Sequence, residues 1–448
     1  MSSGSFIRTG MLADQYGNQH QLTDELARGG QGVVYRTTDA DLAVKQPVAA
    51  DGEVDRSADL QAQIRRFLRI RCLPLPPRMP ISLPLAVLRD EPGYVMSLLS
   101  EMEPFSAFEL RGIMRDELAR APIPGWLAGS NDKSTALLLM HYAKTGSTKR
   151  RLRALAKAAA ILARLHAAGL VYGDISPNNC FMSQGDSQDV WLIDADNLRL
   201  ERIRGGGSVY TPRYGAPEVV QGTDQTRPRS DAWAFAVMAF ETLALVHPFI
   251  GQKILDPNED AGGWDAEPVT EGAPADLDEQ AYAGYFPFVD DEYDDSNRAV
   301  SGLPRKLILT PQLARLFQET FGAGRAKPWR RPAMAFWALE LSRAHDMSVV
   351  CPDCAMTYLL DHTTCPYCDT HRPRIVVAAT DRWQVVLEPR DGVVLLPQRL
   401  FHPFSLELNG STQYEAVLDY ENELATHARG TDPLPTGLSF QFLKGEVQ

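Results

Sequence analysis

Short hydrophobic runs alternate with turn-forming segments along the first hundred residues. The runs QLTDELA, VVYRTT and LAVK are separated by GGQG and DAD. Runs of this length, joined by glycine- and aspartate-containing turns, are typical of an antiparallel meander. Strand-like sequence returns in GYVMSLL, after a proline-punctuated loop. The pattern therefore predicts a β-rich segment over about the first 105 residues.

One helix interrupts this β-rich segment. Hydrophobic residues recur at helical spacing over 59–70, which predicts an amphipathic helix with a single apolar face. The residues on that face are Leu60, Ile64, Phe67 and Leu68.

From about residue 105 the pattern becomes helical. It is clearest over 149–169, where the terminal Gly169 suits a helix C-cap. Helical spacing returns over 310–324 and 331–345, and strand-like runs follow beyond the cysteines. The fold class predicted is therefore α+β, with a small β-rich lobe before a larger helical lobe.

The stretch 232–250 is apolar on all sides and about as long as a membrane span. Such a helix either crosses a bilayer or forms the buried centre of a large soluble domain. It carries Glu241 near its middle, no second stretch of this kind accompanies it, and its flanks have no basic bias. We therefore expect burial within the protein and no membrane association.

Four cysteines form two C-x-x-C pairs, CPDC and CPYC, ten residues apart. This spacing is typical of a zinc ribbon, in which four thiolates bind one structural Zn²⁺ and leave no open coordination position. Two disulfides are the alternative, which an intracellular location disfavours. We expect His362 to be a loop residue, and Cys72 and Cys180 to be small buried hydrophobes. The four predicted zinc ligands are Cys351, Cys354, Cys365 and Cys368.

The 448-residue chain has a formal net charge of −12, but the acidity is local. Fourteen Asp and Glu residues, and no Lys or Arg, lie within 256–297. We interpret this segment as a solvated surface insertion. The rest of the chain has no strong basic field, so we expect no nucleic-acid partner. The N-terminal sequence lacks the apolar run of a secretory signal, which predicts a cytoplasmic protein.

The segment LARGGQGVVYR places glycines between two predicted strands. Glycines there allow backbone N–H groups to close over nucleotide phosphates. An ordinary hairpin turn is the alternative, but Lys45 ends the next strand and can pair with phosphate oxygens. The candidate nucleotide-binding residues in and after this loop are Ala27, Gly29, Gly30, Gly32, Val34 and Lys45.

Carboxylate and amide side chains follow the helix predicted over 149–169. Asp174 and Asn179 lie five residues apart in VYGDISPNN, and Asp194 ends the apolar run VWLID. Asp174 can accept a hydroxyl proton, whereas Asn179 and Asp194 offer the oxygen ligands that Mg²⁺ prefers. Taken singly, such residues more often form turns.

These motifs occur in the order found in protein kinases, and the chain resembles that family over about residues 20–345. The resemblance implies a bilobal kinase fold that uses ATP and Mg²⁺. It implies that Asp174 is the catalytic base, that Lys45 pairs with phosphates, and that Asn179 and Asp194 hold magnesium.

Later motifs extend the resemblance. TPRYGAPE is similar to the substrate-side motif of protein kinases, and it implies an ion pair between Glu218 and Arg331. Asp231 and Trp233 open the apolar helix as they do in kinases. Thr211 in this motif resembles the threonine of serine/threonine kinases. A phosphoserine or phosphothreonine product on a protein substrate is therefore expected.

Several positions depart from the family pattern. Ala27 replaces the first glycine of the loop, and Ser176 replaces the lysine that usually follows the base. Tyr172-Gly173 replaces His-Arg, and Ala195-Asp196 replaces Phe-Gly. The acid of the N-lobe helix that pairs with the strand lysine has no clear counterpart: Asp59 and Gln61 have suitable spacing, and Glu53 comes early.

The departures keep two alternatives open. One is an ATP-binding pseudokinase that serves as a scaffold, and the other is a small-molecule phosphotransferase, which TPRYGAPE disfavours. Phosphorylation of Ser208 or Thr211 is a further hypothesis, because both lie in the predicted activation segment.

The order of kinase, zinc ribbon and β-rich tail resembles a bacterial group associated with a metal-dependent protein phosphatase and a von Willebrand A-type protein. That resemblance implies both as partners. The predicted domains are a kinase N-lobe at 1–105, a C-lobe at 106–345 with the insertion 256–297, a zinc ribbon at 346–372 and a small β-rich domain at 373–448.

Overall fold

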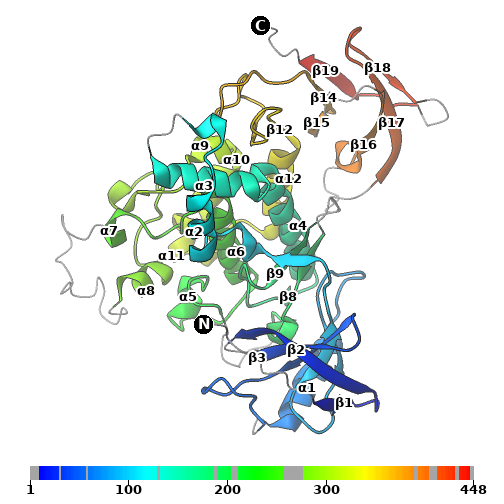
Figure 1. Cartoon of the computed structure of the whole chain (residues 1–448), viewed down its shortest axis with the longest axis vertical. Coiled ribbons are helices and arrows are strands. Elements are labelled where there is room, and N and C mark those ends of the chain that lie inside the picture. Colours follow the sequence, from blue (N-terminus) through cyan, green and yellow to red (C-terminus); the bar gives the residue numbers. More distant parts are fainter. Residues whose placement is uncertain are drawn as a thin grey trace.

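The computed structural model shows a β-rich N-terminal lobe, a larger helical body and a group of C-terminal strands (Figure 1). This mixture of helices and sheets confirms the α+β class. The residues described are 10–29, 32–56, 59–128, 132–184, 189–202, 210–255, 276–387, 392–402, 411–428 and 433–443.

The N-terminal lobe contains an antiparallel six-stranded sheet with the order β1-β2-β3-β4-β6-β5. Alternate residues such as Val33, Tyr35 and Val44 are buried on one face, which is the period-two pattern of a strand. The strands are β1 (Met11–Ala13), β2 (Gln19–Gly29), β3 (Gly32–Thr37), β4 (Leu42–Gln46), β5 (Pro84–Val87) and β6 (Tyr94–Ser97).

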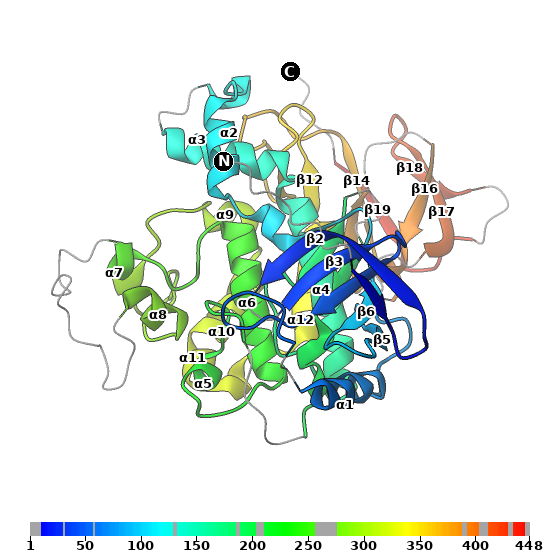
Figure 2. The same cartoon turned by 60° about the horizontal axis from the view of Figure 1, so that its bottom comes forward.

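Helix α1 (Leu60–Arg71) packs against β5, as Figure 2 shows. Asp59 caps the helix by accepting a hydrogen bond from the backbone N of Ala62 at 3.0 Å. The helix predicted over 59–70 is thus confirmed, but its apolar face was partly wrong. Phe67 and Ile70 are the buried residues, whereas Leu68 is 44% exposed.

The helical lobe is organised around α6 (Pro228–Ala244), whose residues from Ser230 to Ala244 are all buried. This confirms the predicted burial of the apolar stretch. In the described part of the chain, no helix combines the length and the apolar character needed to cross a bilayer. The other helices are α2 (Gly112–Arg120), α3 (Lys133–Lys144), α4 (Ser147–Ala167), α5 (Pro217–Val220), α7 (Gln252–Leu255), α8 (Leu277–Tyr282), α9 (Arg305–Ile308), α10 (Pro311–Phe321), α11 (Ala323–Ala326) and α12 (Met334–Asp346).

Aromatic side chains fix α6 against its neighbours. Trp233 stacks on Phe249 with ring centroids 5.3 Å apart, and both meet Phe321 edge to face at the same distance. Phe240 contacts Phe317 on α10 at 5.2 Å. This rigid centre positions the segments that precede and follow α6.

Short paired strands flank the loops that carry Asp174, Asn179 and Asp194. β7 (Met102–Pro104), β9 (Cys180–Ser183) and β10 (Val190–Leu192) form one antiparallel sheet, and β8 (Leu170–Val171) pairs with β11 (Arg199–Leu200). The loop between β8 and β9 carries Asp174 and Asn179, and Asp194 follows β10. All three residues therefore lie at the ends of short paired strands.

The solvated insertion predicted at 256–297 is confirmed for the acidic run 292–295, which is exposed, but not for the residues around that run. Residues 256–275 lie outside the described residues, but 276–297 pack into the helical lobe. Asn297 is fully buried and donates hydrogen bonds to the carbonyl oxygens of Phe249 at 3.0 Å and Pro287 at 2.9 Å. The acidic composition of this half therefore did not reveal that it also contains residues buried in the helical lobe.

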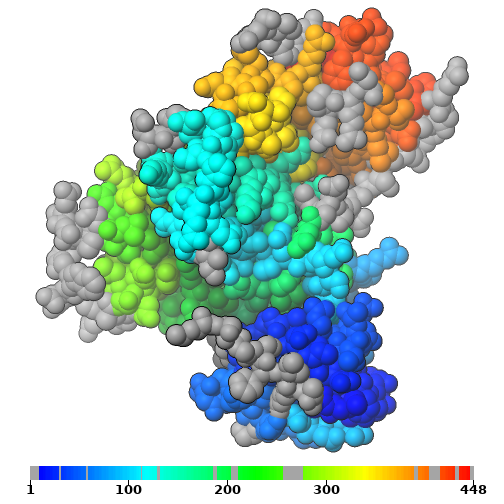
Figure 3. All heavy atoms as spheres, viewed as in Figure 1, coloured from blue at the N-terminus to red at the C-terminus, as the bar shows by residue number. Residues whose placement is uncertain are grey.

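The C-terminal strands form the end of the molecule opposite the N-terminal lobe (Figure 3). They make a two-stranded sheet and two three-stranded sheets, with the orders β12-β13, β15-β14-β19 and β16-β17-β18. The strands are β12 (Ser348–Val350), β13 (Thr357–Leu359), β14 (Ile375–Ala379), β15 (Gln384–Leu387), β16 (Gly392–Pro397), β17 (Ser411–Asp419), β18 (Leu424–His427) and β19 (Ser439–Leu443). The domain boundaries drawn from the sequence stay predictions.

Candidate active site

Strand β4 positions Lys45 beside the glycine-containing turn. In the register of β3 and β4, Val34 lies opposite Lys45. A Cβ atom on Gly32 would lie 2.8 Å from the carbonyl oxygen of Gln46 and 3.1 Å from Cε of Lys45, so only glycine fits there. Ala27 pairs with Val34, and Gly29 with Gly32. Gly30 lies outside the described residues.

Asp231, at the start of α6, shapes the loop that carries Asp174. One carboxylate oxygen accepts a hydrogen bond from the backbone N of Tyr172, and the other from that of Gly173, both at 2.9 Å. Gly173 has φ +88°, a left-handed conformation that strongly favours glycine. This backbone geometry accounts for glycine at a position where the kinase pattern has arginine.

Asn179 and Asp194 are tied to the same loop. The side-chain N of Asn179 donates to the carbonyl oxygen of Asp174 at 2.9 Å. The backbone N of Ile193 donates to the carbonyl oxygen of Asn179 at 3.0 Å, and the Tyr172 hydroxyl donates to the carbonyl oxygen of Ile193. These bonds place Asp194 next to the loop that carries Asp174 and Asn179.

Two carboxylates surround Lys45. Its Nζ atom forms an ion pair with Asp194, and it donates to Asp196 Oδ2 at 2.9 Å. Burial raises the pKa of Asp194 to about 6, against the opposing influence of Lys45. Burial also acts to raise the pKa of Asp196, but Lys45 and hydrogen bonds outweigh it and lower that pKa. The pair of carboxylates therefore titrates unequally.

The sequence left open which acid of the N-terminal lobe pairs with Lys45, and neither Asp59 nor Gln61 takes that place. Asp59 is 64% exposed and caps α1, and Gln61 is exposed. The sequence of α1, LQAQIRRFLRIR, contains no acidic residue. Instead, Lys45 forms ion pairs with the carboxylates of Asp194 and Asp196.

The TPRYGAPE motif contacts the loop that carries Asp174 at one end and the helical lobe at the other. Thr211 Oγ1 donates to Asp174 Oδ1 at 2.6 Å. The fully buried Arg331 side chain donates to the two carboxylate oxygens of Glu218 at 2.7 and 2.8 Å, which confirms the predicted pair. Ser208 lies outside the described residues.

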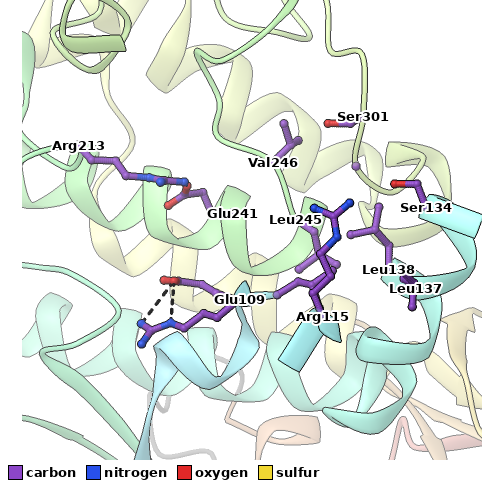
Figure 4. A pocket seen from close by; sticks show the side chains of 13 residues that line it. Glu109, Arg115, Ser134, Leu137, Leu138, Arg213, Glu241, Leu245, Val246 and Ser301 are labelled. Carbon is purple, nitrogen blue, oxygen red and sulfur yellow. Dashed lines mark hydrogen bonds and ion pairs between the residues drawn. The ribbon is translucent and has the colours of Figure 1, made fainter. Parts of the chain in front are cut away.

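A cavity of about 380 Å³ opens beside this motif, between α2, α3 and the end of α6 (Figure 4). Its polar lining contains charges of both signs. Arg111 lies 3.4 Å from Glu109, and Nε of Arg213 donates to the buried Glu241 at 2.9 Å. Arg115 also lines the cavity. Apolar side chains, among them Leu137, Leu138 and Val246, line the rest of the cavity, so it offers both polar and apolar contacts.

The four cysteines of the two C-x-x-C pairs converge on one point. Their Sγ atoms all lie within 4.8 Å of one another, with Cys351 and Cys368 3.5 Å apart and Cys354 and Cys365 3.6 Å apart. A disulfide would bring two sulfurs to about 2.05 Å, so the thiols are free. A tetrahedral zinc site with Zn–S distances of about 2.3 Å requires sulfurs about 3.8 Å apart. The cluster therefore fits zinc.

The other cysteine predictions had mixed outcomes. Cys180 is buried as expected, but Cys72 is exposed just after α1, so that prediction was wrong. His362 lies outside the cluster.

The sequence analysis missed two contributors to the site. Asp196 was noted only as a departure from Phe-Gly, and Tyr172 only as a replacement for histidine. The signal was present in VWLIDADN, where a second carboxylate follows Asp194 by two residues. Both carboxylates reach Lys45 because of the 3₁₀ turn at Ala195–Asn197. The sequence pattern does not predict this turn.

Comparison with known proteins agrees with this geometry. Residues 130–262 match the protein kinase domain family. The chain is 34% identical over 125 residues to the serine/threonine-protein kinase PknL of Mycobacterium tuberculosis, covering 26% of this chain and 31% of PknL. It is 35% identical over 100 residues to the serine/threonine-protein kinase PkaB of Streptomyces coelicolor, covering 20% of this chain and 24% of PkaB.

The similarity is thus confined to part of each protein. The chain covers less than a third of the length of PknL or PkaB, and the matched family segment begins after Lys45. That segment contains Asp174, Asn179, Asp194 and Thr211, the residues that the structure brings around the catalytic loop. Residues 130–262 are therefore similar to a protein kinase domain, and both relatives are serine/threonine-protein kinases.

Proposed function

We propose that the chain is a protein serine/threonine kinase that transfers the γ-phosphoryl group of ATP to a Ser or Thr hydroxyl. The observation that carries the proposal is the contact between Thr211 and Asp174, because it ties the substrate-side motif to the candidate base. Lys45, Asp194 and Asn179 lie around the same loop and strand ends.

In this proposal each residue acts through its own chemistry. Asp174 orients the acceptor hydroxyl and accepts its proton, and Thr211 holds the carboxylate in place. Lys45 pairs with phosphate oxygens in a buried setting, where its charge acts more strongly than in water. Gly29 and Gly32, at the facing ends of β2 and β3, allow backbone N–H groups to approach the phosphates.

Asn179 and Asp194 suit magnesium. The hydrogen bond from the Asn179 side-chain N to Asp174 leaves the amide oxygen for a cation, and Asp194 adds a carboxylate oxygen. Bound magnesium would neutralise charge on the phosphates during transfer. The protein's own part is to hold these two oxygen donors on a strand end and a loop that hydrogen-bond to each other.

The cavity beside Arg213 suits the polypeptide that flanks the acceptor residue. Arg213 lies two residues after Thr211, so a chain that places its hydroxyl at Asp174 passes this cavity. This position favours a protein substrate over a small molecule. The paired charges at the rim offer hydrogen bonds to side chains of either sign.

We further propose that the cysteine cluster binds one structural Zn²⁺. The expected result is about one zinc per chain by metal analysis, and loss of the fold around β12 and β13 after chelation. A metal-free protein whose cysteine region stays folded would contradict it.

The partners and location rest on the sequence resemblance. We propose a cytoplasmic kinase that acts with a metal-dependent protein phosphatase and a von Willebrand A-type protein. Free thiols at all six cysteines agree with a reducing compartment. Reciprocal binding between the purified proteins tests the partnership, and no binding in either direction would refute it.

The function is tested by incubating the protein with magnesium and labelled ATP beside Asp174→Asn. Wild type should phosphorylate itself or a generic protein, whereas the variant should bind ATP and transfer little. ATP binding by wild type without any transfer would instead support the scaffold alternative.

A further inference from the structure

The ion pair of Lys45 has an unusual composition. Its two carboxylates come from one short segment, Asp194 and Asp196, and all three side chains are at most 16% exposed. If Asp194 holds magnesium, as the proposed function requires, Lys45 needs another anion to fix its position. The only other carboxylate recorded beside it in the described residues is Asp196.

Helix α1 cannot supply that anion. It contains no Asp or Glu, and the acid that precedes it, Asp59, is exposed and bonded to the helix N-terminus. On the inward face of the helix lies Gln63, whose Oε1 is buried without a hydrogen-bond partner among the described residues. On its buried side, α1 therefore offers a neutral amide oxygen and no carboxylate.

A second contact joins α1 to the same segment. Arg66 donates to the carbonyl oxygen of Asp196 at 3.0 Å through Nε and at 2.7 Å through Nη2. Nη2 also donates to Asn197 Oδ1 at 3.1 Å. Gln63 and Arg66 are three residues apart, so they share one face of the helix. Helix α1 thus binds the backbone of Asp196 through Arg66, and the carboxylate of Asp196 pairs with Lys45.

We propose that Asp196 is the positioning residue for Lys45, replacing a helix acid, and that Arg66 transmits the position of α1 to it. In this arrangement Asp194 and Asp196 divide two tasks, metal binding and lysine positioning. The inference rests on the proposed function for its consequences in catalysis, but the contact itself can be tested without any transfer.

The direct test is the rate of Lys45 acylation at one fixed pH in the nucleotide-free protein, measured by peptide mass spectrometry. The Lys45 ammonium is held by the carboxylates of Asp194 and Asp196, so loss of one of them should expose it to the reagent. Asp196→Asn should therefore raise the acylation rate about tenfold. Asp59→Asn is the matched control, because it retains the cap and should leave the rate unchanged.

The KM for ATP, and its restoration by a second substitution, show whether Asp196 positions Lys45 or only stabilises the fold. Asp196→Asn should raise the KM for ATP about tenfold, and Asp196→Glu should restore most of the affinity. Adding Gln63→Glu to Asp196→Asn should return part of it by moving the charge to α1. Circular dichroism verifies that each variant is folded.

Two results would overturn the inference. One is an acylation rate that Asp196→Asn leaves unchanged while Asp194→Asn raises it. The other is loss of transfer in Asp196→Asn with normal ATP affinity and normal Lys45 acylation, which would place Asp196 at the metal or the acceptor. If wild type transfers no phosphate, the proposed function is wrong. The acylation experiment then still tests whether Asp196 positions Lys45, because it does not require phosphoryl transfer.

Discussion

At the residue scale, the short hydrogen bond between Thr211 and Asp174 links substrate-side and catalytic segments. Thr211 Oγ1 lies 2.6 Å from a carboxylate that is 3% exposed. A charge-assisted hydrogen bond in such a setting is stronger than a neutral one and restricts the carboxylate to one orientation. Thr211 therefore restricts the orientation of the Asp174 carboxylate.

Thr211→Val should lower kcat, because the base loses its partner while the volume of the side chain stays similar. Loss of one such bond corresponds to about 1.5–3 kcal/mol, or roughly ten- to a hundredfold in rate. Thr211→Ser retains the hydroxyl and is the matched control, measured by steady-state transfer to a protein substrate. Equal rates for the valine and serine variants would show that the contact has no catalytic role.

The carboxylate of Asp194 predicts a pH dependence. Because its pKa is raised to about 6, it becomes protonated as the pH falls through that value, and a protonated acid is a poor ligand for magnesium. Magnesium-dependent nucleotide binding should therefore weaken below about pH 6, as measured by calorimetry. Asp194→Asn should be weak at every pH. Undiminished wild-type binding at about pH 5 would contradict this assignment.

Motif order and the resemblance to protein kinases predicted Lys45, Asp174, Asn179 and Asp194 from the sequence, and the structure brings Lys45 to Asp194 and Asn179 to Asp174. The role of Asp196 could not be read, because it depends on the conformation of a three-residue turn. Asp194 itself has φ +59°, which turns the chain so that two carboxylates reach one ammonium. Strand and helix patterns carry no information on such a turn.

At the element scale, the pair Glu218–Arg331 joins the start of α5 to the segment before α12. Arg331 is fully buried, lies over the ring of Trp233, and donates to the backbone of Gly324 at 2.8 Å. One side chain thus connects α5, α6 and α11. Removing either partner would leave the other as a buried, unpaired charge.

Glu218→Ala should therefore destabilise the protein by about 3–5 kcal/mol. The matched control is Glu319→Ala, which breaks the exposed pair with Arg315 on α10 and should cost about 0.5 kcal/mol or less. Denaturant unfolding measures both. Similar losses for the two variants would mean that burial adds nothing to the Glu218 pair.

The existence of helices with strong hydrophobic periodicity could be predicted from the sequence. Which face of each helix is buried was harder to predict. The hydrophobic run that became α6 is buried on all sides, so any rotation satisfies its pattern. In α1 the pattern allowed two adjacent faces, and packing against β5 selected the one with Phe67 and Ile70. The acidic half-segment 276–297 was misread because composition does not show that Asn297 satisfies buried carbonyl groups.

At the scale of the whole molecule, one buried ion pair fixes the C-terminal strands to the helical lobe. Asp346, at the end of α12, accepts a hydrogen bond from Trp383 Nε1 at 2.7 Å and pairs with Arg399. Burial acts to raise the pKa of Asp346, but Arg399 and His345 outweigh it and lower the pKa to about 2. The stabilisation is therefore present above the ordinary Asp pKa and is lost as the pH falls towards about 2.

Asp346→Ala should release the C-terminal strands from the helical lobe, at a cost of about 3–5 kcal/mol, because Arg399 and Trp383 would lose their buried acceptor. Limited proteolysis should then cut the chain near β14 faster than in wild type. Asp381→Ala, whose exposed carboxylate only meets Arg382, is the control. Unchanged cleavage in Asp346→Ala would show that the strands are held by other contacts.

If Asp174 serves transfer to Ser or Thr in proteins, the phosphorylated amino acids formed by the chain should show it. The most direct measurement is phosphoamino-acid analysis after magnesium and labelled ATP are supplied with a degenerate peptide mixture containing Ser, Thr and Tyr acceptors. We predict phosphoserine and phosphothreonine with wild type, and a loss of at least about a hundredfold with Asp174→Asn at unchanged ATP binding. Phosphotyrosine as the main product, or equal transfer by Asp174→Asn, would contradict it.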